Sequence, residues 1–155
     1  MGKKKTSLQS AYPKAVRIWL IVGLVMVVGQ IVIGGITRLT ESGLSITEWE
    51  PLTGAMPPLN AADWQVEFEK YQASPQYEKI FADISMADFK FIYFWEWFHR
   101  QWARFMGLVF IVGFIIFWRK GYLDRPLMRR LGVVVLLAAL AASFGWIMVA
   151  SGLID

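Results

Sequence analysis

The chain has 155 residues, of which 56% are hydrophobic and 15% aromatic, and its mean hydropathy is +0.44. This apolar share exceeds that of an average soluble domain and indicates a protein that lives in lipid. The net charge is +4 and cysteine is absent. The lack of cysteine excludes a disulfide-stapled domain, a thiolate nucleophile and a cysteine-ligated metal.

Three apolar segments are long enough to cross a bilayer, and they predict an all-α, polytopic membrane helix bundle. The expected transmembrane helices cover residues 18–36, 91–118 and 131–153. A cleaved signal peptide is the alternative reading of the first segment. Its 19 apolar residues exceed a usual signal core, and no convincing small-residue cleavage site follows, so a retained anchor is favoured.

The distribution of charge predicts which side of the membrane each flank and loop faces. Residues 1–17 carry five bases and no acid, and residues 119–130 carry five bases against Asp124 alone. Both flanks are therefore expected on the cytoplasmic side, next to anionic membrane lipid, and the net charge requires no nucleic-acid partner. Residues 38–92 hold nine acids and four bases, so the loop predicted over residues 37–90 faces the outer compartment.

This outer loop is too apolar for disorder and is predicted to be a structured lid lying on the membrane. Residues 61–71 read as a short helix with Asn60 as its N-cap, because three aromatic residues share one face at helical spacing: Trp64, Phe68 and Tyr71. Ser85 is predicted to cap the second long helix, with Asp88 completing a capping box. Pro57 and Pro58 predict an extended turn.

The chain's only histidine, His99, follows Glu96 by one helical turn at the start of the second apolar segment. Segment 91–118 has 28 residues and would span about 42 Å, more than a bilayer core of about 30 Å. Ala103 and Met106 continue the same face inward. An acid and an imidazole beside an apolar wall suit a flat apolar ligand near the outer interface.

Arg100 and Arg104 lie one turn apart on an adjacent face, where two guanidinium groups can clamp carboxylates. A histidine for iron, arginines for propionates and an apolar wall are the ingredients of a heme pocket. Two other interpretations stay open: His99 as an interhelical hydrogen-bonding group, and arginines that snorkel or pair with Glu96. A di-iron centre requires repeated Glu-x-x-His motifs, which one histidine cannot supply.

Several motifs together resemble the heme A synthase family, of the proteobacterial and mitochondrial type that lacks a loop cysteine pair. They are Gly34-Gly35-Ile36-Thr37-Arg38-Leu39-Thr40-Glu41-Ser42-Gly43-Leu44-Ser45-Ile46-Thr47-Glu48-Trp49, then Pro51-Leu52-Thr53-Gly54-Ala55-Met56-Pro57-Pro58, Glu96-Trp97-Phe98-His99-Arg100, and Gly145-Trp146-Ile147-Met148-Val149-Ala150-Ser151-Gly152-Leu153. In order and spacing they cover most of residues 30–155.

The resemblance implies oxidation of the C8 methyl of heme O to the formyl of heme A, for aa3-type cytochrome oxidase. The family fold has eight transmembrane helices in two halves, each with a pair of axial histidines. His99 matches the axial histidine of the second helix, hence an iron ligand, and Glu96 matches the acid needed for turnover. Arg100 belongs to the motif, whereas Arg104 and Arg38 are candidate propionate contacts on physical grounds only.

The resemblance also implies the surroundings of the reaction. Heme O is the substrate and heme b a cofactor of the complete protein, with heme O synthase and cytochrome oxidase assembly factors as partners. The location implied is a bacterial inner membrane, in preference to the mitochondrial one. In the third helix, Ala141-Ala142 stand where the family has Gln-Gly.

The match covers the first three helices of eight, and three hypotheses follow from it. The chain is the N-terminal portion of a heme A synthase, inactive alone; or a heme-binding split subunit that takes its second axial ligand from another polypeptide; or a membrane structural or assembly subunit without catalysis. The first is favoured. With one histidine and no complete bundle, one face of the iron stays open and heme binding by the chain alone is expected to be weak.

Overall fold

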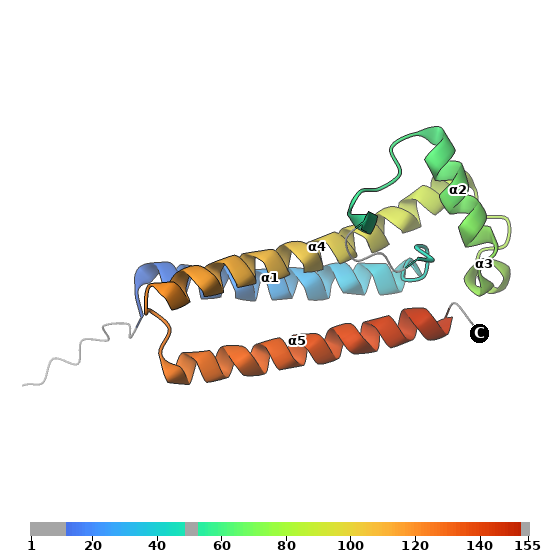
Figure 1. Ribbon diagram of the computed structural model, residues 1–155. Coiled ribbons are helices and arrows are strands. Elements are labelled where there is room, and N and C mark those ends of the chain that lie inside the picture. Colours follow the sequence, from blue (N-terminus) through green and yellow to red (C-terminus); the bar gives the residue numbers. More distant parts are fainter. Residues whose placement is uncertain (1–11, 49–52, 153–155) are drawn as a thin grey trace, which may run out of the picture.

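Three long helices account for most of the computed structural model, which describes residues 12–48 and 53–152 (Figure 1). The long helices are α1 (Lys14–Leu39), α4 (Met86–Arg119) and α5 (Arg125–Gly152). Between α1 and α4 lie a short 3-10 helix, η1 (Thr53–Ala55), and two short helices, α2 (Ala61–Gln72) and α3 (Pro75–Lys79). The described residues contain no strand.

Each long helix is long and apolar enough to cross a membrane. The expected all-α membrane fold is therefore confirmed. The helices extend beyond the apolar segments, because capping residues and turns, not hydropathy, decide where a helix ends. Helix α4 has 34 residues, about 51 Å, so it projects beyond a bilayer core of about 30 Å. Four residues of the motifs named in the sequence analysis lie outside the described ones: Trp49, Pro51, Leu52 and Leu153. Residues 1–11 of the expected cytoplasmic flank also lie outside them.

The two predicted N-caps are confirmed. The Asn60 side chain accepts a hydrogen bond from Asp63 N at 2.9 Å and begins α2. Ser85 Oγ accepts from Asp88 N at 3.2 Å and begins α4, and it donates to Asp88 Oδ2 at 2.6 Å. In a capping box the acid accepts from the backbone N–H of the N-cap residue, so Asp88 pairs with Ser85 in a different way from the one predicted. The Asn60 cap fixes the start of α2 within the lid, and the Ser85 cap fixes where the lid ends and where α4 begins.

Helices α1 and α4 pack directly against each other, with aromatic rings of one over glycines of the other. A Cβ on Gly113 would overlap the Trp19 indole, and a Cβ on Gly29 would lie 2.8 Å from Trp102 Cζ2. Each indole N–H also donates to a backbone carbonyl of the opposite helix, at 3.1 Å to Val109 and 2.9 Å to Met26. The glycines therefore allow a close helix pair whose polar indole groups are satisfied without water.

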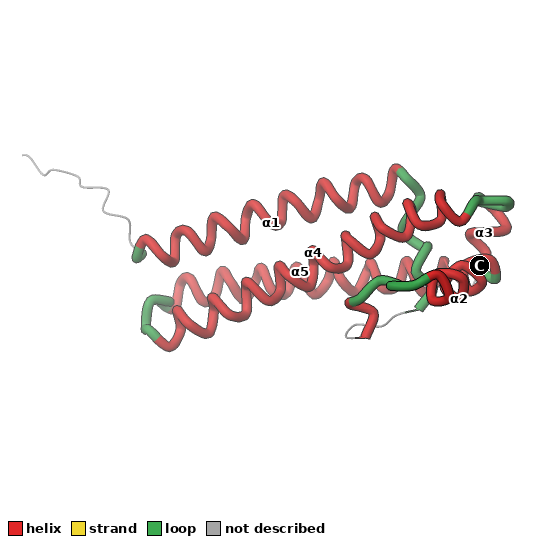
Figure 2. Tube along the Cα trace, turned by 90° about the horizontal axis from the view of Figure 1, so that it is seen from above, coloured by secondary structure: helices red, strands yellow, loops and turns green. Residues whose placement is uncertain are grey.

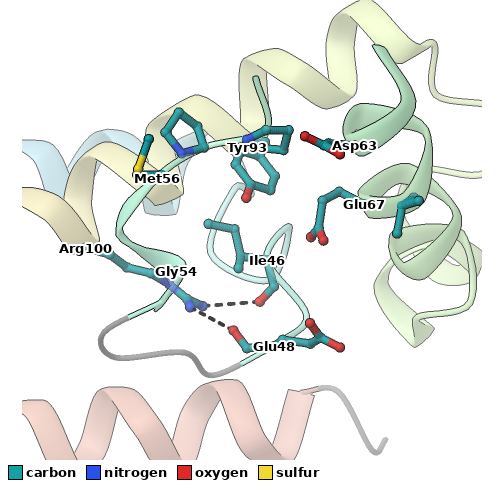
Figure 3. Close-up of a pocket in the computed structure, with 11 residues that line it drawn as sticks. Ile46, Glu48, Gly54, Met56, Asp63, Glu67, Tyr93 and Arg100 are labelled. Carbon is teal, nitrogen blue, oxygen red and sulfur yellow. Dashed lines mark hydrogen bonds between the residues drawn. The ribbon is translucent and has the colours of Figure 1, made fainter. Parts of the chain in front are cut away.

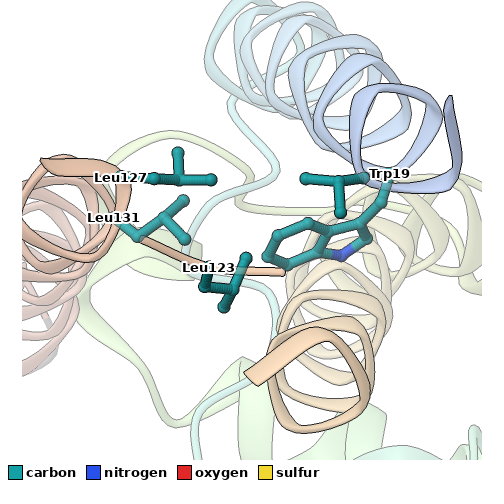
Figure 4. Close-up of a cluster of buried hydrophobic side chains, with 5 residues drawn as sticks. Trp19, Leu123, Leu127 and Leu131 are labelled. Atoms are coloured by element: carbon teal, nitrogen blue, oxygen red, sulfur yellow. The ribbon is translucent and has the colours of Figure 1, made fainter. Parts of the chain in front are cut away.

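Helix α5 joins this pair only near its first turns. Leu123, Leu127 and Leu131 are buried against Val16 and Trp19 (Figure 4). From Gly132 to Met148 its residues are exposed. Figures 1 and 2 show α5 running along the other long helices, while the short helices gather at the opposite end of the molecule from the α4–α5 turn.

The lid packs on the first turns of α4 through an aromatic cluster. Tyr71 of α2 and Phe89 of α4 are fully buried and stack with ring centroids 5.0 Å apart. Burial raises the pKa of the Tyr71 phenol. On the lid surface, hydrogen bonds from Lys70 Nζ to Glu48 and Glu67 raise the pKa of Lys70. The cluster holds the lid beside the α4 segment that carries Glu96 and His99.

Candidate functional site

Glu96 is an acid buried between α4 and the loop that follows α1. Its side chain is enclosed, with 2% of the residue exposed. Glu96 Oε2 accepts hydrogen bonds from Ser45 Oγ at 2.7 Å and from Ile46 N at 2.7 Å, while Oε1 is paired with Arg100. A buried carboxylate is costly unless it is paired and hydrogen-bonded, and here both oxygens are engaged.

Arg100 binds the same loop from the adjacent turn of α4. Besides pairing with Glu96, it donates to the backbone carbonyls of Ile46 at 3.2 Å and Glu48 at 3.3 Å (Figure 3). These contacts match the interpretation in which Arg100 pairs with Glu96, and they tie the loop to the helix. Arg100 also borders a cavity of about 310 Å³, lined in addition by residues such as Met56, Tyr93 and Glu67.

His99 is partly buried and faces α1, not the loop. Its Nε2 lies 2.7 Å from the side-chain nitrogen of Gln30. A Cβ on Gly34, one turn further along α1, would lie 3.0 Å from the same Nε2. The imidazole is thus held in the α1–α4 interface, beside the glycine pair that opens the first sequence motif.

Arg104 lies one turn beyond Arg100. Its Nη1 donates to Gln101 Oε1 at 2.9 Å, and the Gln101 amide in turn donates to the Ala55 carbonyl. Arg38 is exposed in the last turn of α1. Helix α4 and the end of α1 therefore bring Glu96, His99 and the three arginines to one end of the bundle, but Glu96 and His99 point to different neighbours.

A heme and a bare metal ion need different donors from the protein. The described residues hold no group of three or more His, Cys, Asp or Glu side chains able to enclose a metal ion. A heme needs less from the protein, because the porphyrin itself supplies the equatorial donors and the protein adds only axial ligands. Among the described residues, His99 would hold the heme iron through Nε2, once that atom is released from its contact with Gln30.

Two residues of this site were not singled out from the sequence. Ser45 lies in a loop motif, and no spacing rule links it to Glu96. Gln30 carried a weak signal, because it is the polar interruption of an otherwise apolar segment. A polar side chain in a membrane helix faces protein or a ligand far more often than lipid, and that reasoning would have directed attention to it.

The fold and site together define a multi-pass helical membrane protein with a buried acid and a histidine near one end of a tightly packed helix pair. The chain belongs to the family described as cytochrome oxidase assembly protein, whose model matches residues 17–155.

Curated relatives support the same assignment. The chain is 51% identical over 146 residues to the heme A synthase of Rhodospirillum centenum, 47% over 152 residues to that of Nitrosospira multiformis, and 54% over 139 residues to that of Methylorubrum populi. These matches cover 94%, 98% and 90% of this chain but only 39%, 43% and 36% of the relatives. No solved structure matches the chain.

Proposed function

We propose that this chain is the N-terminal part of a heme A synthase, which oxidises the C8 methyl of heme O to the formyl of heme A for aa3-type cytochrome oxidase. One observation carries the proposal: Glu96 and His99 lie one turn apart, in a helix pair of a chain about half identical to proteins named heme A synthase. We expect the activity to need the remaining length of those relatives, or a second subunit that replaces it.

In this proposal His99 would hold the heme iron, and Glu96 would be the catalytic acid–base group. A resident heme b would supply one-electron chemistry at its iron. As the C8 methyl is oxidised, its electrons would pass to an acceptor outside this chain, and Glu96 would accept a released proton or stabilise positive charge. Ser45, Ile46 N and Arg100 keep its carboxylate fixed for that task. Arg100 and Arg104 assist in binding, through propionates that reach polar surroundings at the outer interface.

The same proposal includes the location of the protein in the cell and its partners. The protein lies in a bacterial inner membrane with residues 1–17 and 119–130 in the cytoplasm and the lid in the outer compartment. The substrate reaches it from a heme O synthase, and the product leaves with cytochrome oxidase assembly factors.

A second candidate function is that of a structural or assembly subunit. The observation in its favour is that, apart from the Glu96–Arg100 pair within α4, the polar contacts described at Glu96 and His99 join two protein segments: Glu96 joins the loop to α4, and His99 joins α1 to α4. Such a network stabilises a bundle without any chemistry.

Variants of the complete protein distinguish the two functions. If the proposal holds, His99→Ala changes the iron absorption spectrum itself, whereas Glu96→Ala retains heme but loses heme O oxidation. Equal loss of heme in both variants would contradict this division of roles. If His99→Ala lowers thermal stability and leaves heme bound, the structural function is the better one.

A further inference from the structure

Gln30 is the polar side chain of α1 that faces the proposed iron ligand. Its amide nitrogen lies 2.7 Å from His99 Nε2. Its amide oxygen is buried and has no hydrogen-bond partner among the described residues. A buried amide with one satisfied and one unsatisfied end is costly in an apolar span, so its single bond to His99 is the contact that accounts for its place there.

This bond matters because it uses Nε2, the His99 atom that could bind iron. Whichever group donates, the Gln30 amide occupies Nε2, either through the nitrogen's lone pair or through its proton. An imidazole nitrogen binds a metal through its lone pair. Nε2 therefore cannot serve the amide and the iron at the same time.

We propose that Gln30 competes with heme iron for His99: it holds Nε2 in the α1–α4 interface of the heme-free protein, and it must release that atom when iron binds. This inference rests on the proposed heme function and adds to it a residue that sets heme affinity. Gln30 is then a competitor of iron and not a contact of the bound heme.

Removal of the Gln30 amide should change heme affinity in a defined direction. The Gln30–His99 bond stabilises only the heme-free protein, and after its release the amide loses its partner in the interface. Removing the amide therefore favours the heme-bound protein. A single neutral hydrogen bond corresponds to about a two- to tenfold change in an equilibrium constant. We expect a gain in heme affinity of that size, whereas a residue that merely supported the fold would cause a loss.

The test is a titration of ferric heme b into the purified full chain in detergent, followed by absorbance at the heme band. The variants are wild type, Gln30→Leu and the matched control Gln101→Leu. Gln101→Leu also removes a glutamine amide, from α4 near His99, but the Gln101 amide bonds to the Ala55 carbonyl and to Arg104 and not to His99. Gln30→Asn, whose shorter amide withdraws from Nε2, gives a second measurement if Gln30→Leu does not fold.

The expected result is a dissociation constant about two- to tenfold lower in Gln30→Leu than in wild type, and a larger heme-induced rise in melting temperature. Gln101→Leu should show no such gain. Binding that is equal to or weaker than wild type in Gln30→Leu overturns the inference and leaves the proposed function standing. If neither wild type nor variant binds heme, the inference is overturned, whereas the proposed function of the complete protein is decided separately by the His99→Ala and Glu96→Ala variants described above.

Discussion

The substitution Ser45→Ala removes one hydrogen bond from the buried carboxylate without changing the acid itself. Ser45 is 1% exposed and Glu96 is 2% exposed, and Ser45 Oγ donates to Glu96 Oε2 at 2.7 Å. A hydrogen bond to a charged group contributes about 1.5 to 3 kcal/mol, because the charge strengthens it and water cannot replace it. The bonds from Ile46 N and Arg100 remain, so we expect a loss of about 2 kcal/mol.

This loss should appear locally, as easier opening of the loop from α4. A change of about 2 kcal/mol raises an opening equilibrium roughly thirtyfold. Hydrogen exchange of the Ile46 amide, which donates to Glu96 Oε2, measures that opening directly. Ser143→Ala is the control, because Ser143 Oγ donates only to the Ala139 carbonyl of its own exposed helix face. If Ile46 exchanges at the wild-type rate in Ser45→Ala, the Glu96 network does not hold the loop.

Three further predictions concern packing and the lid. Gly113→Ala should lower the free energy of unfolding by about 1 to 3 kcal/mol, because the new methyl overlaps the Trp19 indole. Gly107→Ala is the control and should leave the free energy of unfolding unchanged, because a Cβ there meets no neighbouring atom within 4 Å. Thermal denaturation in detergent compares the two variants. Tyr71→Phe should stabilise the lid by about 1 kcal/mol in a denaturant titration, because the buried hydroxyl has no partner among the described residues. The contacts of Lys70 with Glu48 and Glu67 raise the pKa of Lys70 and stabilise the lid below pH 10, and this contribution is lost as Lys70 loses its proton at higher pH. Burial raises the pKa of the Tyr71 phenol, so its ionisation above pH 10 favours the unfolded lid. Lid proteolysis should therefore increase above pH 10 and depend less on pH in Tyr71→Phe.

The membrane helices were predictable because length, hydropathy and cap chemistry are local properties. The apolar segments locate α1, α4 and α5, and Asn60 and Ser85 locate the starts of α2 and α4. The pairing of α1 with α4 was not predicted, since it depends on which glycine meets which indole. Gly113 and Trp19 are far apart in the sequence, and no periodicity relates them.

In the site, too, local features were predictable from the sequence and contacts between distant segments were not. Glu96 and His99 were singled out because two polar groups one turn apart are unusual in an apolar helix. Their partners were not, because Ser45 and Gln30 approach from segments whose positions only the folded bundle decides. Spacing suggested a shared face toward one ligand, whereas the folded chain points Glu96 at a loop and His99 at α1.

The most direct test of the central claim is the heme content of membranes that make heme O. Cells should express a complete protein carrying this chain, as wild type or as Glu96→Gln, which keeps the size of the side chain and removes its charge. Heme O and heme A are then separated by chromatography. The account predicts heme A in the wild type and heme O without heme A in Glu96→Gln. Undiminished heme A in Glu96→Gln would contradict the catalytic role of Glu96, and no heme A in the wild type would contradict the proposed function.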